Sequence, residues 1–327
     1  MLSCTSPATI ALMSESSLVL IDAHALIYRA YFAFPPLTTP EGKLVNAVYG
    51  FTRILLTSIE DLSPEYIAVA FDLPKPTFRH TQFAGYKAQR KEMPDDLQPQ
   101  IEIVKQVVKS LNIPDFSVEG YEADDVIGTL ARQASVMNDA GGDPNKVVIL
   151  TGDRDAFQLV TDDIHVLMPA QGKNPPREFG PSEVKDRMGI RPDQIIDYKA
   201  LAGDASDNIP GVPGIGDKTA CHLLTVFDSV ENLYQEIKDQ TPRVSDKLIL
   251  KPNVLKKLSE GYESSVMSKQ LATIDQNVPI QLKLEDCRVA GYDKSQAVEL
   301  FYSLGFKSLQ KLLPKDDFEN GLQDALF

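Results

Sequence analysis

Tryptophan is absent from this sequence of 327 residues, and cysteine is scarce. The three cysteines, Cys4, Cys221 and Cys287, stand far apart and form no C-x-x-C pair. Structural zinc sites and disulfide frameworks both need closely or regularly spaced cysteines. The spacing therefore argues against a structural zinc site and fits a reducing compartment.

Long apolar runs are also missing. The first apolar stretch, residues 18–34, is interrupted by an aspartate, a histidine and an arginine, so it is not expected to span a membrane. The first 13 residues lack the positively charged start of a secretory signal. We therefore expect a cytoplasmic protein with a disordered extension at residues 1–17, in which Met13 is an alternative start.

Positive charge is in deficit, because 33 lysines and arginines face 46 aspartates and glutamates, for a net charge of −13. Such a balance at first sight opposes a polyanionic partner. Acidic residues that cluster around a metal ion make the net charge a poor guide to the partner. The distribution of charge along the chain therefore has to be examined. The motifs G-x-S-x-G, H-E-x-x-H and G-x-x-x-x-G-K-[ST] are absent, which argues against the enzyme classes that depend on them.

Four short apolar runs rich in β-branched residues occur in the first half of the chain, and three of them end in an aspartate. The runs are residues 18–22, 67–72, 147–153 and 164–168. Between them, residues 98–111 and 123–137 carry apolar side chains at helical spacing. This alternation predicts an α/β fold with a mostly parallel central sheet. Strands that each deliver an aspartate at their carboxyl end predict one site at that edge of the sheet.

From about residue 181 the pattern becomes helical, with glycine and proline between the helices. The expected helices are residues 181–188, 192–201, 218–226, 230–237 and 254–258. We therefore predict an α/β domain over residues 18–200 and a helical domain over residues 201–327.

Carboxylates recur at several places along the chain. They are Asp22, Asp72, the group Glu122, Asp124 and Asp125, the pair Asp153 and Asp155, and the pair Asp204 and Asp207, which share a face if their turn is helical. Each place alone also fits a helix cap or a surface ion pair. Their occurrence together predicts convergence, and convergent carboxylates repel one another without cations. Oxygen ligands favour Mg²⁺ or Mn²⁺ over zinc, and two such ions can promote phosphodiester hydrolysis.

One segment, residues 74–93, stands out against the acidic background. Five lysines and arginines face one glutamate there, and three aromatic residues lie among them. Basic and aromatic side chains together suit the phosphates and stacked bases of nucleic acid. Because the segment follows Asp72, we expect it to overhang the carboxylates, and this position favours a function over the alternative of a solvated charged loop.

Several short motifs occur in one order along the chain. They read L-I-D-A-H at residues 20–24, F-R-H at 78–80, G-Y-K-A-Q-R at 85–90, G-Y-E-A-D-D at 120–125, L-T-G-D-R-D at 150–155, L-A-G-D-A-S-D-N at 201–208 and G-V-P-G-I-G-D-K-T-A at 211–220. In this combination the chain resembles the 5′ nuclease (5′-3′ exonuclease) domain of bacterial DNA polymerase I, within the flap endonuclease superfamily. The resemblance runs from about residue 18 to beyond residue 304.

The resemblance implies a role for each carboxylate and a PIN-like fold with a helical arch at about residues 74–100. Asp22, Asp72, Glu122 and Asp124 would surround one metal ion with Asp125 close by, and Asp153, Asp155, Asp204 and Asp207 would form the side of the second. The ions would be Mg²⁺ or Mn²⁺. Lys87 and Arg90 match the arch residues that contact the scissile phosphate region, and they are therefore the candidate catalytic residues.

The resemblance also implies DNA contacts. Residues 211–220 match a helix-hairpin-helix element, in which glycines bring the backbone close to DNA and amides at the next helix start bind a phosphate. A simple tight turn is the alternative, and the G-x-P-G-I-G-x-K-T pattern favours the phosphate site. A K⁺ ion at this hairpin is also implied. The expected DNA-binding residues are Arg79, Tyr86, Lys87, Arg90, Gly211, Gly214, Gly216 and Lys218.

The function that the resemblance implies is hydrolysis of DNA at 5′ flaps and 5′ ends by a monomer, in primer removal and repair, with RNA primer–DNA hybrids as a further substrate. The family's polymerase domains are absent from this sequence, which agrees with an excised domain and with a stand-alone nuclease alike. Two other classes share parts of the pattern. A PIN-type ribonuclease has the acids but usually lacks the hairpin and the arch, and a non-catalytic DNA-structure-binding module keeps the hairpin but loses carboxylates.

Overall fold

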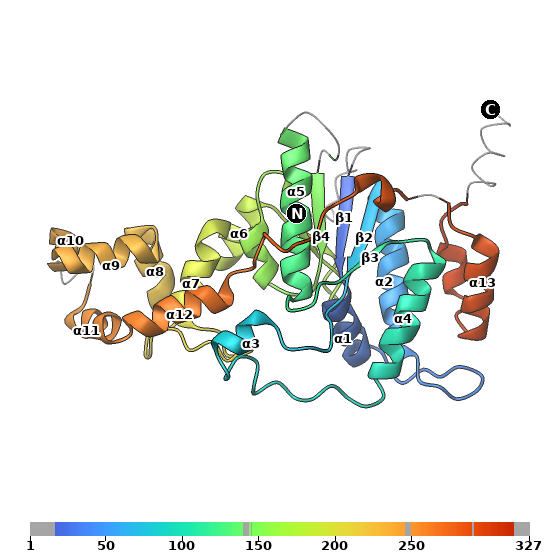
Figure 1. Ribbon diagram of the computed structural model, residues 1–327, viewed down its shortest axis with the longest axis horizontal. Helices are drawn as coiled ribbons and strands as arrows, with labels where there is room; N and C mark the ends of the chain where they lie inside the picture. The colour runs from blue at the N-terminus through green and yellow to red at the C-terminus, as the bar shows by residue number, and fades with distance from the viewer. Residues whose placement is uncertain (1–16, 140–143, 145, 246–249, 290, 317–327) are drawn as a thin grey trace, which may run out of the picture.

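A six-stranded sheet forms the centre of the structure, a computed structural model that describes residues 17–139, 144, 146–245, 250–289 and 291–316 (Figure 1). In spatial order the strands are β3 (Asp115–Phe116), β2 (Tyr66–Ala70), β1 (Ser17–Asp22), β4 (Lys146–Leu150), β5 (Ile164–Met168) and β6 (Arg177–Phe179). Neighbouring strands run parallel except β5 and β6, which are antiparallel at one edge. The predicted mostly parallel α/β sheet is confirmed. Of the expected N-terminal extension, residues 1–16 lie outside the described residues, and Ser17 begins β1.

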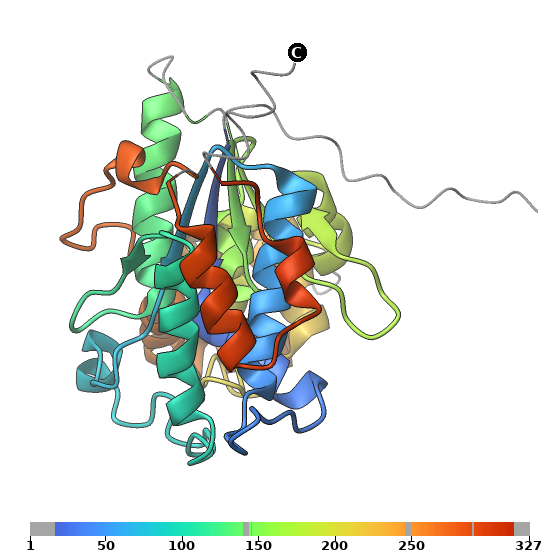
Figure 2. The ribbon, with the colours of Figure 1, turned by 90° about the vertical axis from the view of Figure 1, so that its right-hand side faces the viewer.

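The strands are apolar throughout because their side chains alternate between two buried layers. In β1, Leu18 and Leu20 belong to the layer under α5 (Ala123–Asp139). Val19 and Ile21 belong to the opposite layer, under α2 (Asn46–Leu62) and α4 (Gln98–Ser110). Figure 2 shows this second face, where α2 and α4 lie across the sheet.

Helix α1 (Ala23–Ala33) begins directly after β1. The Oδ1 atom of Asp22 accepts a hydrogen bond of 3.0 Å from the amide of Ala25, which caps the helix. Helix α2 packs closely on α1 because Gly50 has no side chain, and a Cβ atom there would lie 2.6 Å from the Cβ of Ala30. The carboxylate that ends β1 is thereby held by a helix that is itself fixed to the core.

Helices dominate from residue 181, as predicted, and extend away from the sheet on the side of α5 (Figure 1). They are α6 (Pro181–Met188), α7 (Ile195–Ala202), α8 (Asp217–Phe227), α9 (Val230–Asp239), α10 (Pro242–Ser245), α11 (Pro252–Glu260) and α12 (Tyr262–Ala272). Helix α6 starts at Pro181 and ends before Gly189, whose φ of 76° suits a left-handed cap. Among the described residues, no helix has both the length and the apolar character needed to cross a bilayer.

The chain does not stay in the helical region. After α12, residues 273–282 run back along α5, and α13 (Lys294–Ser303) packs over α4 on the second face of the sheet. Ala297 and Phe301 of α13 are fully buried there. The predicted division at residue 200 therefore separates α13 from the α/β layer to which it contributes.

The segment expected to form a helical arch contains little helix. Within residues 74–97 only α3 (Phe78–Gln82) is helical, and turns occupy most of the remainder before α4 begins. Three prolines and Gly85 interrupt the segment, and both residue types oppose a continuous helix. The segment runs beneath the carboxyl edge of the sheet, where α3 lies close to the end of α12 (Figure 1).

Candidate active site

Seven of the nine predicted carboxylates gather at the carboxyl edge of the sheet, around two adjoining cavities. Asp22 ends β1, and Asp72 and Asp153 follow β2 and β4. A cavity of ≈ 470 Å³ is lined by these three residues together with Glu122, Asp124, Lys87 and Arg90. A second cavity of ≈ 570 Å³ is lined by Asp153, Asp155, Lys199 and Asp204. Asp153 lines both, so the two cavities meet at this residue.

Backbone groups hold the carboxylates of the first cavity. Besides its contact with Ala25, Asp22 accepts a 2.8 Å hydrogen bond from the Thr151 hydroxyl through Oδ2. Asp72 accepts a 2.8 Å hydrogen bond from the amide of Ala123, at the start of α5. The amide of Asp72 in turn donates to Nδ1 of His24 at 3.1 Å, so that nitrogen is an acceptor. His24 therefore helps to hold the backbone of Asp72 in place. Burial lowers the pKa of His24.

Burial and neighbouring charges raise the pKa of two of these carboxylates, Asp22 and Asp124. Burial raises the pKa of Asp22 to about 7, and the charges of Asp72 and Asp153 add to the rise. Burial also raises the pKa of Asp124 well above its usual range, with contributions from Asp22 and Asp153. Such a set of oxygen donors, crowded and short of positive charge, fits a divalent cation. Among the described residues, however, no three acidic, histidine or cysteine side chains already stand in the arrangement of a formed metal site.

The second cavity contains a lysine that the sequence patterns did not single out. The Lys199 side chain is only 9% exposed, contacts Asp155, and donates a 2.6 Å hydrogen bond to Asp204. Burial alone would raise the pKa of Asp204, but the charge and hydrogen bond of Lys199 outweigh it and hold that pKa at about 2. The pKa of Asp155 is nevertheless raised to about 7, because burial and the neighbouring Asp153 outweigh the same lysine.

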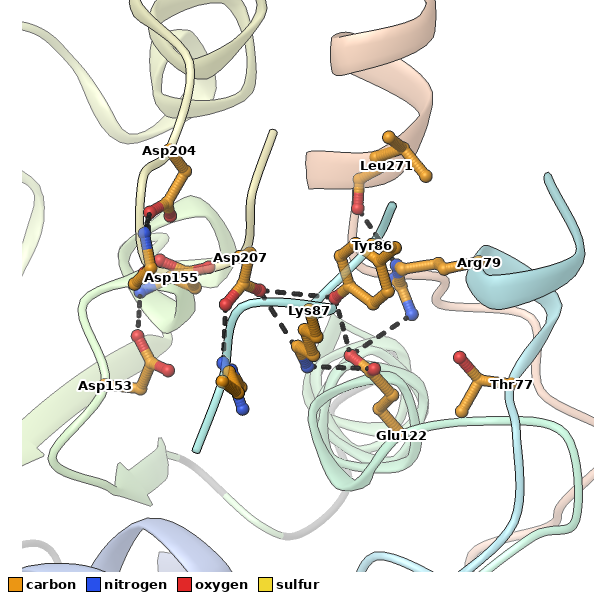
Figure 3. A network of polar contacts seen from close by, with 12 residues as sticks. Thr77, Arg79, Tyr86, Lys87, Glu122, Asp153, Asp155, Asp204, Asp207 and Leu271 are labelled. Carbon is orange, nitrogen blue, oxygen red and sulfur yellow. Dashed lines mark hydrogen bonds and ion pairs between the residues drawn. The ribbon is translucent and has the colours of Figure 1, made fainter. Parts of the chain in front are cut away.

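The basic segment lies against Glu122 and Asp207 (Figure 3). Lys87 donates a 2.8 Å hydrogen bond to Glu122, and Arg90 donates one of 2.5 Å to Asp207. The Tyr86 hydroxyl lies 3.1 Å from Glu122 and 3.2 Å from Asp207. Tyr86 itself is buried, whereas the Arg90 side chain is 49% exposed. Two cations and a phenol thus contact the carboxylates Glu122 and Asp207.

Asp204 and Asp207 do not share a helical face. Residues 204–209 form a turn closed by a bridge between Asp204 and Ile209, with hydrogen bonds of 2.8 Å in both directions. Asp204 faces Asp155, whereas Asp207 faces Glu122 and the basic segment (Figure 3). The expectation that both belong to the second-metal side is not met by this geometry.

Asp125 and Arg79 also lie elsewhere than expected. Both are buried and form a two-fold ion pair, with Nη1 to Oδ2 and Nη2 to Oδ1 distances of 2.7 Å. Asp125 faces the interior because neighbouring residues of a helix point about 100° apart, which turns it away from the cavity that Asp124 lines. The surroundings of this pair do not suit a metal ligand and a DNA contact, the roles that the sequence suggested.

The hairpin that follows α7 divides into a buried and an exposed part. Gly211 is buried: its amide donates to the Ser268 hydroxyl at 2.9 Å, and its carbonyl accepts from the Ser264 hydroxyl at 2.6 Å. A Cβ atom on Gly211 would lie 2.3 Å from the amide nitrogen of Gly203, and the φ of Gly211 is +60°. Glycine is therefore required at residue 211 for close approach inside the protein, not toward a ligand.

Gly214, Gly216 and Lys218 form the exposed part, at the start of α8. The Lys257 ammonium donates to the carbonyl of Gly214 at 2.9 Å, so this hairpin carbonyl already has a cationic partner. Residues 216–218 are exposed, and amides at a helix start suit an anion such as a phosphate.

Comparison with known proteins finds matches over most of the chain. Residues 17–189 match the family model "5′-3′ exonuclease, N-terminal resolvase-like domain", and residues 190–295 match "5′-3′ exonuclease, C-terminal SAM fold". The DNA polymerase I of Bacillus subtilis is 41% identical over 305 residues, which cover 93% of this chain and 33% of the relative. That of Chloroflexus aurantiacus is 45% identical over 308 residues, covering 93% and 31%. The chain thus spans about a third of the length of these relatives.

Solved structures share the fold. The T5 D15 protein, co-crystallised with metal ions, matches with a TM-score of 0.61 at 19% identity, over 90% of this chain and 96% of that one. The catalytic core of Rad2 in complex with a DNA substrate matches with a TM-score of 0.55 at 15% identity, over 91% and 92%. At such identities the likeness concerns the fold alone.

Proposed function

The chain belongs to the 5′-3′ exonuclease family, and from this premise we propose that it hydrolyses DNA phosphodiester bonds at 5′ flaps and 5′ ends. One observation carries the proposal: Asp22, Asp72, Glu122, Asp124 and Asp153 line a single cavity at the carboxyl edge of the sheet. Proteins of the same fold crystallised with metal ions and with DNA are consistent with it. Removal of primers and repair are the cellular settings that we propose.

The acidic side chains would hold two divalent ions. Asp22, Asp72, Asp124 and Asp153 are the donors for the first, and Asp155 and Asp204, with Asp153 between them, for the second. Mg²⁺ and Mn²⁺ suit these oxygen donors. When bound, such a pair supplies an activated water and stabilises the charge on the leaving oxygen.

The chain's own cations position the phosphate. Lys87 and Arg90 line the first cavity, and both contact carboxylates. A phosphate that enters the cavity offers Lys87 and Arg90 negatively charged oxygens, as the carboxylates do. The two cations can therefore bind the phosphate without being left unpaired. Tyr86 keeps Glu122 and Asp207 in place beneath them.

The exposed part of the hairpin binds the duplex. Gly214, Gly216 and Lys218 would contact the DNA backbone, and such contacts carry no sequence information, so recognition follows shape. RNA primer–DNA hybrids as substrates, a monomeric state, a cytoplasmic location and a K⁺ ion at the hairpin all stay predictions.

The test is cleavage of an internally labelled 5′-flap duplex with Mg²⁺ and with EDTA, beside a single-stranded RNA. We expect Mg²⁺-dependent incision at the flap junction and little loss of RNA. Degradation of RNA alone would point to a PIN-type ribonuclease instead. Binding of the flap without incision would point to a non-catalytic DNA-binding module.

A further inference from the structure

The segment that leads from the helical region back to the sheet is held by side chains. In this return segment, residues 271–282, many backbone groups pair with polar side chains rather than with another strand. Gln158 binds the carbonyl of residue 272 and the amide of residue 274 at 3.0 and 2.9 Å. Thr129 and Gln133, one turn apart on α5, each bind a carbonyl and an amide farther along. The return segment is thereby fixed along α5.

Arg79 and Asp125 hold the start of the return segment. Arg79 donates to the carbonyls of Leu271 and Thr273 at 2.9 and 2.6 Å, and it also makes the two-fold ion pair with Asp125. Asp125 accepts from the amides of Asp275 and Glu122 at 2.8 and 3.0 Å. The Arg79 residue is 3% exposed and Asp125 is fully buried, so neither reaches a ligand on the surface.

A continuous set of contacts therefore joins the hairpin to the carboxylates. Helix α12 holds the hairpin backbone at Gly211 through Ser264 and Ser268. The end of the same helix is bound by Arg79, and through Asp125 to the backbone of Glu122. Arg79 also lies in α3, the helix that begins the basic segment.

We infer that Arg79, paired with Asp125, is a positioning residue that fixes the distance between the duplex-binding hairpin and the cleavage site. The inference rests on the proposed function. Arg79 joins helix α12, the backbone of Glu122 and the basic segment. The relative placement of these three parts decides which phosphate reaches the carboxylates. If the pair is broken, the hairpin still binds DNA, but any of several neighbouring phosphates can then reach the cleavage site.

Three variants test this role. Arg79→Met leaves Asp125 as an unpaired buried charge, so it lowers stability as well as removing the anchor. Arg79→Met with Asp125→Asn removes both charges and keeps an acceptor oxygen for one of the two amides, so it recovers part of the lost melting temperature. Lys146→Met breaks a half-buried ion pair with Glu178, far from the site, and serves as a control for lost stability alone.

The first readout is the length of the products from a 5′-flap duplex. The wild type and Lys146→Met should give one dominant product, whereas both Arg79 variants should give several adjacent lengths. If the double variant regains the single product together with its stability, Arg79 only stabilises the fold and the inference is wrong.

The second readout is the affinity for the flap at several salt concentrations. A residue that contacts a phosphate lowers the salt slope by about 1 when it is removed, and we expect this for Lys218→Ala but not for Arg79→Met. A reduced slope in Arg79→Met would make Arg79 a DNA contact and overturn the inference.

Hydrogen exchange separates this inference from the proposed function. In the double variant the amides of Thr273 and Ile274, whose acceptors are not changed by the substitutions, should exchange faster, whatever the enzyme cuts. If the wild type does not cut DNA, the proposed function fails while this measurement still decides whether Arg79 couples the segments. Unchanged exchange would remove the coupling.

Discussion

Two groups of aspartates lie near the carboxyl edge of the sheet: the first, with Asp22 and Asp124, lines the first cavity, and the second, with Asp155 and Asp204, lines the second cavity. The groups differ in what balances their charge. Burial raises the pKa of Asp22 to about 7, and no lysine or arginine is paired with it among the described residues. At Asp204 burial acts in the same direction, but the charge of Lys199 overrides it and the pKa falls to about 2. Asp155 lies beside the same lysine, yet burial and Asp153 still raise its pKa to about 7, so Lys199 balances the charge of Asp204 much more than that of Asp155.

The comparison indicates how each group responds to a metal ion. At the first group a cation relieves repulsion that the nearby Lys87 offsets only in part, so binding there also stabilises the folded protein. At the second group a cation has to compete with Lys199, which already neutralises part of the charge. We therefore expect the first group to bind divalent ions more tightly.

The largest expected effect follows removal of one acid from each group. Asp124→Asn and Asp155→Asn should each lower kcat by roughly 10³-fold or more, because a charged metal ligand is lost, while flap binding stays largely intact. Without metal, Asp124→Asn should raise the melting temperature more than Asp155→Asn does, since Asp155 also has Lys199 as a partner. Single-turnover cleavage and thermal melting in EDTA measure both effects. Near wild-type cleavage by either variant would refute the two-metal assignment.

A second effect concerns the basic segment. Lys87→Ala should slow turnover about 10²-fold, because Lys87 lines the first cavity, and should also lower the melting temperature, because its mostly buried ion pair with Glu122 is lost. Lys75→Ala is the matched control, since Lys75 belongs to the same segment but its 55% exposed side chain pairs with Glu119 away from the cavity. An unchanged rate in Lys87→Ala would remove the segment from the mechanism.

A third prediction concerns the removal of Lys199, which should leave the second group without its cation and so make it more like the first. Lys199→Met leaves Asp155 and Asp204 without their cation, and breaking a buried ion pair from one side typically costs about 3–5 kcal/mol. Divalent ions should then raise the melting temperature of the variant more than that of the wild type. The measurement is thermal melting with and without Mg²⁺. Equal shifts in the two proteins would show that Lys199 does not compete with the metal.

Much of the fold was predictable because local patterns determine it. Strands buried on both faces are apolar throughout, and all four predicted runs are strands. The return segment was not predictable, because its backbone is satisfied by side chains such as Gln158, 114 and 116 residues away along the chain. Helix α1 was missed because it follows β1 without a turn, within one apolar stretch.

The site was predictable where an acid follows a strand, since parallel strands bring their carboxyl ends to one edge. The sequence could not tell Asp124 from Asp125, because adjacent acids on a helix point apart and only the fold decides which one meets a cavity. Lys199 gave no signal, since a lysine is buried only where acids from other segments surround it. Here those acids are Asp155 and Asp204.

The smallest expected effect concerns an acid outside both groups. Glu178 lies between His165 and Lys146, and its hydrogen bonds to them lower its pKa from 4.5 to about 2. A lowered folded-state pKa contributes stability that is present above pH ~4.5 and is lost as the pH falls toward ~2. Glu178→Gln should therefore cost about 1–2 kcal/mol near pH 6, an amount reduced by solvent screening, and almost nothing near pH 2. Urea unfolding across this range measures the difference. A cost that does not change with pH would mean that Glu178 acts through its shape, whereas the predicted decline would show that a partner cation keeps a carboxylate charged outside the site just as Lys199 does within it.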